Sequence, residues 1–364
     1  MMIGVDASRA AMQGGVGVGR YSRELIAALI AASDHRYTLY ANGVERPAWA
    51  DAPGVTWRSL PWPLLWTHLR LSWELACHAP DALLIPAHVV PAVHPRATVV
   101  TIHDLGYLFF PQCHPPLQRL HLRLSTAWSA RAAARILADS ACTREDLVRH
   151  LGVPQSKIDV AYPGVSQRFG PQPAAAIEAL RRRYHLPARY LLYLGTLQPR
   201  KNLVRLIQAH ALVPEAPVLV LAGAAGWRSA ATRAAIQAAG DRVRWLGYVP
   251  DSDLPALLSG AQALALVSLY EGFGIPVLEA MACGIPVIAS STSSLPEIVG
   301  DASILVDPLL VDSIADGIRR LCEDMDMARH LAERGLLQAA RFTWEGCARV
   351  ALDGIERAHA DAQS

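Results

Sequence analysis

Short apolar runs alternate with amphipathic segments of helical period along the whole chain. The apolar runs are almost continuously hydrophobic, which is typical of strands that are buried on both faces of a parallel sheet. Strands that alternate with helices predict an α/β protein with helices on both faces of its sheets. The predicted strands are 3–5, 37–40, 82–85, 98–102, 135–138 and 158–161 in the first half, and 190–194, 218–222, 243–246, 263–267, 286–289 and 304–306 in the second.

A chain of 364 residues is long enough for two domains. The stretch 169–187 contains Gly-Pro-Gln-Pro at 170–173, before a charged helical piece, and indicates a hinge. We therefore expect two Rossmann-like domains, 1–168 and 169–342, with a terminal helical segment, 343–364, that crosses back to the first. Their parallel sheets would face each other across a cleft, where a ligand site is expected.

The charge of the chain is nearly balanced. The formal net charge is +2, which argues against a nucleic-acid partner. Residues 1–165 carry 15 Lys and Arg against 12 Asp and Glu, and this mildly basic half would suit an anionic acceptor or an acidic membrane surface.

The six cysteines are scattered and form no CxxC pair, which predicts buried free thiols in a reducing compartment. No leader peptide and no apolar run of about 18 residues is evident, so we expect a cytoplasmic protein.

One segment combines a strand, a glycine loop and a helix start. After the strand 263–267, Gly272 and Gly274 permit a tight turn, and Pro276 suits the first turn of a helix. Glu271 would lie on the loop and Glu279 on the helix, at the edge where parallel sheets bind ligands. The spacing alone leaves open an acid–base pair, a metal pair, acceptors for sugar hydroxyls, or two solvated carboxylates.

Two further strands end in polar residues. The strand 190–194 runs into Gly195 and Thr196, and then into the cations of Arg200 and Lys201 before a helix, an arrangement suited to a diphosphate. His103 directly follows the predicted strand 98–102, so it would lie at the C-terminal edge of a parallel sheet. By contrast, the glycine cluster at 14–19 does not fit G-x-G-x-x-G, which makes a dinucleotide site a poor interpretation.

The motif Glu271-x7-Glu279, which begins with Glu-Gly-Phe-Gly-Ile-Pro, resembles the signature of retaining glycosyltransferases with the GT-B fold, specifically glycosyltransferase family 4. The resemblance implies transfer of a hexose from a nucleotide-diphosphate sugar to a hydroxyl, with retention of anomeric configuration. It implies catalytic roles for His103, Arg200, Lys201 and Glu271. It implies donor binding by Gly14, Gly15, Gly195, Thr196, Tyr248, Phe273, Gly274, Ile275, Val277 and Glu279.

The donor and the acceptor are inferred from the same resemblance. The element around His103, His-Asp-Leu followed by Phe-Pro, is similar to that of bacterial mannosyl- and rhamnosyltransferases of polysaccharide assembly, which favours GDP-mannose. No Asp-x-Asp motif lies near these elements, so we expect no metal and no cofactor. The acceptor would be a glycan or a lipid-linked oligosaccharide at the inner face of the cell membrane. A sugar-nucleotide epimerase of the same fold and a non-enzymatic sugar-binding protein are the alternatives.

Two segments leave a membrane contact open. Residues 61–73 contain three tryptophans, and the helix predicted for 116–134 carries arginines four residues apart. Either segment can be a helix that packs on the core with a solvated outer face, or an element that touches lipid headgroups.

Overall fold

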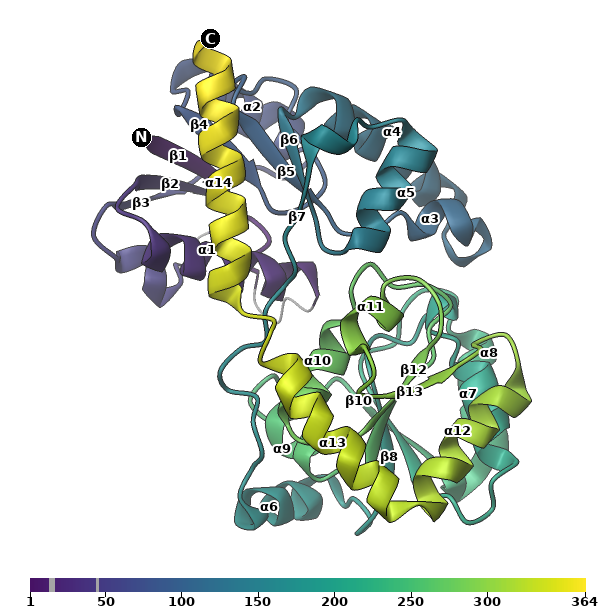
Figure 1. Cartoon of the computed structure of the whole chain (residues 1–364). Coiled ribbons are helices and arrows are strands. Elements are labelled where there is room, and N and C mark those ends of the chain that lie inside the picture. The colour runs from purple at the N-terminus through teal and green to yellow at the C-terminus, as the bar shows by residue number, and fades with distance from the viewer. Residues whose placement is uncertain (13–16, 44–45) are drawn as a thin grey trace. The chain divides into compact units, whose positions relative to one another are not determined.

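The computed structural model describes residues 1–12, 17–43 and 46–364. The chain divides into two compact units (Figure 1). Unit 1 comprises Met1–Phe109, Pro115–Gly164 and Thr343–Ser364, and unit 2 comprises Phe110–His114 and Val165–Phe342.

Unit 1 is built on a seven-stranded parallel sheet of order β3-β2-β1-β4-β5-β6-β7. Its strands are β1 Met2–Asp6, β2 Arg36–Ala41, β3 Val55–Ser59, β4 Ala82–Ile85, β5 Thr98–Ile102, β6 Arg135–Ala138 and β7 Ile158–Val160. Six of them coincide with predicted apolar runs. Strand β3 was not predicted, because this edge strand is only partly buried and carries polar residues at alternate positions.

Helices cover both faces of this sheet. Helices α1 (Val18–Ala32) and α14 (Trp344–Gln363) pack on one face, where they form one hydrophobic core with β1, β2 and β4. A second core lies on the opposite face, beneath five further helical elements of the unit. These are the π-helical turn η2 (Thr67–Leu71), α2 (Ser72–Cys77), α3 (Gly106–Phe109), α4 (Pro116–Ala132) and α5 (Ala141–Leu151).

Unit 2 contains a six-stranded parallel sheet of order β10-β9-β8-β11-β12-β13 around a single large core. Its strands are β8 Tyr190–Leu194, β9 Val218–Ala222, β10 Val243–Gly247, β11 Ala263–Leu266, β12 Val287–Ser290 and β13 Ile304–Val306. Its helices are α6 Ala174–Tyr184, α7 Leu203–Ala211, α8 Ala230–Ala239, α9 Leu254–Ser259, α10 Ile275–Ala282, α11 Leu295–Val299, α12 Val311–Glu323 and α13 Met325–Ala339. Both units are thus Rossmann-like, as the alternation of strands and helices predicted. No helix in the described ranges is long and apolar enough to cross a bilayer.

Apart from the short excursion Phe110–His114, the chain passes between the units after Gly164 and again after Phe342. A Cβ atom added to Gly164 would lie 2.2 Å from the backbone nitrogen of Trp344, so only glycine fits at this crossing. The predicted hinge at 169–187 is wrong, since these residues lie within unit 2 and include α6. The Gly-Pro cluster starts this helix, whose Leu180 is buried in the core.

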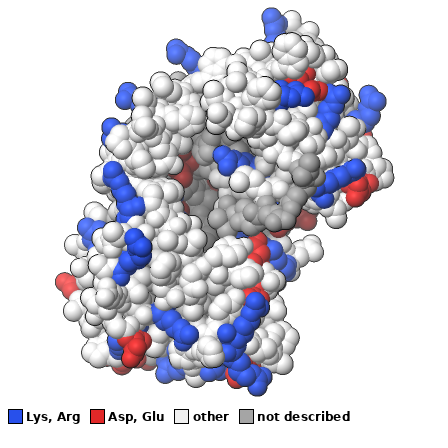
Figure 2. All heavy atoms as spheres, turned by 180° about the vertical axis from the view of Figure 1, so that it is seen from behind, with Lys and Arg blue, Asp and Glu red and all other residues white. Residues whose placement is uncertain are grey.

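The charged side chains are scattered over the face of the molecule seen in Figure 2, as a net charge of +2 would lead one to expect. All six cysteines are free thiols. Cys113, Cys283 and Cys347 are buried, but Cys77 is exposed at the end of the short helix α2, contrary to the expectation that every thiol would be buried.

Candidate active site

In unit 2, glycine ends or follows three adjacent strands of the sheet. Gly195, Gly223 and Gly247 have φ angles of 148°, 145° and 73°, a region that side chains disfavour. The Gly223 N–H donates to the Gly247 carbonyl at 2.7 Å, and a Cβ atom on Gly223 would lie 2.0 Å from the Gly195 oxygen. Thr196 and the exposed Tyr248 follow two of these glycines. Backbone therefore packs against backbone at this edge of the sheet, and of the three glycines only Gly247 has open space where a Cβ atom would lie.

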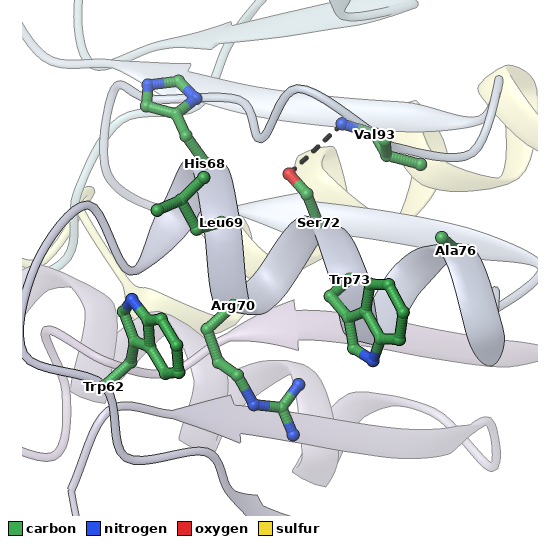
Figure 3. Close-up of a pocket in the computed structure, with 8 residues that line it drawn as sticks. All are labelled: Trp62, His68, Leu69, Arg70, Ser72, Trp73, Ala76 and Val93. Atoms are coloured by element: carbon green, nitrogen blue, oxygen red, sulfur yellow. Dashed lines mark hydrogen bonds between the residues drawn. The ribbon is translucent and has the colours of Figure 1, made fainter.

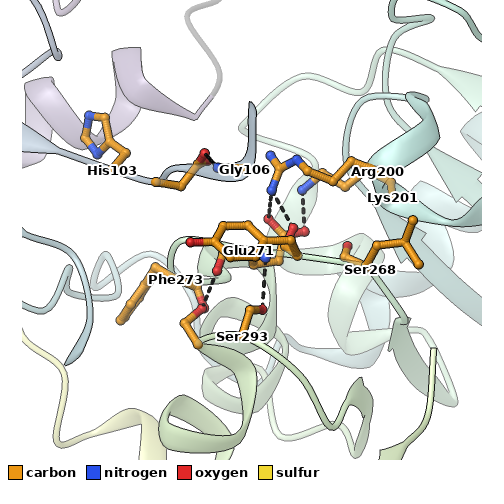
Figure 4. A network of polar contacts seen from close by, with 12 residues as sticks. His103, Gly106, Arg200, Lys201, Ser268, Glu271, Phe273 and Ser293 are labelled. Carbon is orange, nitrogen blue, oxygen red and sulfur yellow. Dashed lines mark hydrogen bonds and ion pairs between the residues drawn. The ribbon is translucent and has the colours of Figure 1, made fainter. Parts of the chain in front are cut away.

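Two cations and a carboxylate form a compact cluster beside this edge. The Lys201 Nζ lies 2.6 Å from Oε1 of Glu271, and Nη1 of Arg200 lies 3.5 Å from Oε2 (Figure 4). Arg200 also donates to the carbonyl of Tyr270. All three charged side chains are largely buried.

The charge state of this cluster follows from its contacts. Burial raises the pKa of Glu271, but the charge of Lys201 and then that of Arg200 lower it, and the result is a pKa below its ordinary value. Glu271 is therefore ionised at neutral pH. One carboxylate between two cations leaves a net charge of about +1, which favours an anionic ligand.

A buried asparagine fixes the segment that carries the two cations. The 3₁₀ turn η5 (Pro199–Lys201) ends at Asn202, whose backbone is left-handed with φ 61°. The Asn202 side-chain amide donates to the carbonyls of Val267 at 3.0 Å and Pro308 at 2.6 Å. The Leu269 N–H donates to the Arg200 carbonyl at 2.9 Å. The turn is thus anchored to the loop that contains Glu271.

Two serines that the sequence did not single out individually hold this loop. The Glu271 N–H donates to Oγ of Ser293 at 3.0 Å, and the Ser294 hydroxyl reaches the carbonyls of Glu271 and Phe273, each at 3.0 Å (Figure 4). Both serines lie in the loop between β12 and α11, and Ser294 is buried. They fix the backbone on which the carboxylate of Glu271 is carried.

The helix after the loop begins as the sequence predicted. Gly274 precedes α10 with φ 107°, and a Cβ atom there would lie 2.6 Å from Cδ2 of Leu295. Ile275 is the first residue of the helix, and Glu279 is buried at 2% exposure one turn later. Val277 is fully buried in the core, so any role of its side chain in donor binding would be indirect.

In unit 1, His103 is buried and both of its ring nitrogens have protein partners. Nδ1 lies 2.7 Å from Oδ2 of Asp139, and Nε2 lies 3.0 Å from the carbonyl oxygen of Pro86. A carbonyl only accepts, so Nε2 carries a hydrogen. Burial lowers the pKa of His103, but the charge of Asp139 raises it, and the result is a raised pKa. In this arrangement the imidazole offers neither nitrogen to a ligand.

Three adjacent strand ends produce this histidine site, since Pro86, His103 and Asp139 directly follow β4, β5 and β6. Asp139 was not predicted from the sequence, although it follows a strand directly, as His103 does. Oγ of Ser140 accepts from the Thr143 N–H at 3.0 Å and caps the N-terminus of α5. The Thr143 hydroxyl in turn donates to the His103 carbonyl at 3.2 Å.

Gly14 and Gly15 lie outside the described residues. Helix α1, which begins soon after them at Val18, places the ring of Tyr21 edge-on to that of His103, with centroids 4.7 Å apart. Across the described ranges, no group of three His, Cys, Asp or Glu side chains is placed to hold a metal ion.

Comparisons with known proteins match both units. The profile of Glycosyltransferase Family 4 matches residues 16–169, and that of Glycosyl transferases group 1 matches residues 178–338. The chain is 34% identical to O-antigen chain mannosyltransferase B of Escherichia coli, over 93% of this chain and 96% of that protein.

Solved structures show the same fold. Sucrose-phosphate synthase from Thermosynechococcus elongatus superposes with a TM-score of 0.77 at 22% identity, covering 100% of both chains. Anabaena HepE, in complex with UDP and glucose, gives a TM-score of 0.76 at 20% identity, covering 98% of this chain and 99% of that one. The expected fold is confirmed, and the chain belongs to the group 1 and family 4 glycosyltransferases of the GT-B fold.

Proposed function

We propose that this glycosyltransferase moves a mannosyl residue from GDP-mannose to a hydroxyl of a growing or lipid-linked glycan, with retention of anomeric configuration and without a metal ion. The observation that carries the donor half of the proposal is the cluster of Arg200, Lys201 and Glu271 beside the glycine-lined strand ends. The epimerase and binding-protein alternatives have no support in the family match.

The cluster suits the diphosphate of the donor. Arg200 and Lys201 are held in place before a ligand arrives, because Glu271 pairs with both and Asn202 anchors their turn. As the bond to the sugar breaks, negative charge builds on the departing diphosphate. Fixed cations that stabilise this charge lower the barrier without reorganisation. They supply in this proposal the charge compensation that a metal ion would otherwise provide.

The remaining polar groups are assigned to the sugar and the nucleoside. Glu279 would accept hydrogen bonds from the ribose, and Glu271 with the N–H groups of Phe273 and Gly274 would orient the hexose. Gly14 and Gly15 are assigned to donor binding from the sequence resemblance alone. His103, both of whose nitrogens are engaged, would act through its charge and its backbone position.

The preference for mannose rests on the mannosyltransferase relative, which is 34% identical across nearly the whole chain. The preference for GDP rests on the sequence resemblance around His103. A relative of this kind acts on O-antigen chains, so we assign a glycan acceptor, on a lipid carrier or on a growing chain. Such an acceptor would be reached in the cytoplasm, at the inner face of the cell membrane.

Donor cleavage tests the proposal directly. Purified protein is incubated in EDTA with GDP-mannose, UDP-glucose, UDP-N-acetylglucosamine and dTDP-rhamnose, and the released nucleotide is identified. We expect release of GDP alone, lost in Lys201→Ala and Glu279→Ala but kept in Arg233→Ala, an exposed position on α8. If no donor is cleaved, or if the two site variants behave as wild type, the assignment is wrong. Nuclear magnetic resonance of the first product formed with an acceptor reports retention or inversion.

A further inference from the structure

Helix α4 of unit 1 has most of its large apolar side chains on the outside, and only Leu122 is half-buried against the core. The residues it buries are small or polar, namely Ser125, Thr126, Ser129 and Ala130. Its exposed side carries Leu117, Leu120, Leu124 and Trp128, spaced 3, 4 and 4 residues apart, and we call these four residues the leucine stripe. This spacing places them on one face of the helix. Leu117 is 83% exposed and Leu124 62% exposed, the reverse of the usual pattern for a helix that covers a core.

A second group of exposed apolar side chains lies on and around the helical segment η2–α2. Trp73, in α2, is 69% exposed, and Trp62, Leu69 and Val93 are also exposed. They line a shallow groove of about 740 Å³ together with Arg70 (Figure 3). In this view the side chains of Trp62, Arg70 and Trp73 project on the same side. We call this group the tryptophan groove.

The two groups lie on the same side of the sheet. Both η2–α2 and α4 contribute to the core on one face of it, and the loop between β4 and β5 connects them. In that loop the Val93 N–H donates to Oγ of Ser72 at 3.2 Å, and the Val90 carbonyl accepts from Nε1 of Trp128 at 3.0 Å. The ring of His94 packs edge-on to Trp128, with centroids 6.4 Å apart. The leucine stripe and the tryptophan groove therefore belong to one outer layer of unit 1.

The charge of this layer is positive. Helix α4 carries three arginines and no acidic residue. Arg119, Arg123 and Arg131 on α4 are exposed, whereas Arg70 is neutralised by Glu74 at 3.1 Å. A row of exposed leucines flanked by arginines, with tryptophans nearby, is the composition of an element that lies in a membrane interface.

We propose that the leucine stripe and the tryptophan groove form a docking surface for an anionic bilayer, with the leucines and tryptophans in the interface and Arg119 and Arg123 on lipid phosphates. Charge complementarity favours a bilayer over a second copy of the chain. A two-fold interface would place the same arginines of both copies close together without acidic residues between them. The inference extends the proposed function, because a lipid-linked acceptor would be met at this surface.

Vesicle cosedimentation tests the surface without donor or acceptor, so its outcome is independent of the proposed activity. The probes are vesicles of phosphatidylcholine alone and of phosphatidylcholine with about 30% phosphatidylglycerol, a lipid that supplies the negative surface potential. We expect binding to the anionic vesicles only, weakened by salt. The variant Arg119→Gln/Arg123→Gln should bind about 25-fold more weakly, at about fivefold for each charge. Leu120→Asn/Leu124→Asn should lose at least about tenfold, because two partly inserted side chains are removed.

The control variants carry the same types of substitution at exposed positions away from the proposed surface. Leu212→Asn/Leu337→Asn and Arg233→Gln/Arg349→Gln alter exposed residues of the same types outside the proposed surface and should bind as wild type. All four variants change exposed positions, and equal urea midpoints would show that they fold. The proposal is overturned if the wild type ignores anionic vesicles or if the surface variants bind as the controls do. It is also overturned if the leucine variant abolishes a dimer in solution and leaves vesicle binding intact.

Discussion

Replacing Lys201 by methionine probes the cluster that carries the proposed donor site. At 2.6 Å, the Coulomb attraction between Lys201 and Glu271 is about 6 kcal/mol at an effective dielectric constant of about 20. The cost of removing both charges from water offsets much of it. Loss of one partner of a buried pair costs about 3–5 kcal/mol. Because Arg200 remains at 3.5 Å, we expect a loss near the lower end, about 3 kcal/mol.

A double-mutant cycle separates this pairing from general damage to the fold. Glu271→Gln alone should also destabilise unit 2, because it leaves two cations without their carboxylate. In the Lys201→Met background, however, the same change should cost little or restore stability, since it removes a buried and poorly compensated charge. Hydrogen exchange of the β8 and β11 amides in urea reports unit 2 by itself, which matters because two units need not unfold together. The pairing would be refuted if the losses in unfolding free energy of the two single variants added up to that of the double variant within about 0.5 kcal/mol.

The same cluster gives a pH dependence whose sign is fixed. The pKa of Glu271 is lowered from 4.5 on folding, so its contribution to stability is complete above 4.5 and is lost as the pH falls through the lower folded value. Lys201→Met should flatten this part of the acid stability curve. An unchanged curve would mean that Lys201 does not set the pKa of Glu271 in solution.

Two further substitutions test other parts of the site. Asp139→Asn removes the charge that raises the pKa of His103, so the imidazole should titrate at a lower pH by nuclear magnetic resonance; an unchanged titration would contradict the ion pair. Gly223→Ala places a Cβ atom 2.0 Å from the Gly195 oxygen and should destabilise unit 2 by more than 2 kcal/mol in urea, on the order expected for backbone strain. Gly240→Ala, also at positive φ but with nothing within 4 Å, should cost only about 1 kcal/mol; equal losses would refute the close-approach argument.

The fold was largely predictable because buried parallel strands leave an unambiguous pattern. Runs such as 98–102 and 190–194 are almost continuously apolar, and the structure places strands there. The edge strand β3 escaped prediction because solvent on one side allows Thr and Arg within it. The hinge was misplaced since Gly and Pro mark a helix start as readily as a linker.

The site was predictable where its residues are close in sequence. Gly274 and the start of α10 follow from local rules, as does the cap of α5 by Ser140. The contacts that depend on the order of the strands in the sheet could not be predicted from the sequence. Asp139 reaches His103 only because β6 lies beside β5, and neither ring nitrogen of His103 could be assigned from sequence. The outer position of the leucines on α4 was equally hidden, since the sequence predicts a helix but not which face the sheet buries.

Protection of Lys201 by nucleotide tests the central claim most directly. Lys157 and Lys201 are the only lysines of the chain, so an amine-reactive label followed by mass spectrometry reads each one separately. Lys157 lies in unit 1, where its Nζ donates to the carbonyls of Ala130 and Arg131, and it serves as an internal control. We predict that GDP in EDTA slows labelling of Lys201 and leaves that of Lys157 unchanged. Labelling of Lys201 that is indifferent to GDP, and to UDP in its place, would contradict a donor diphosphate at this cluster.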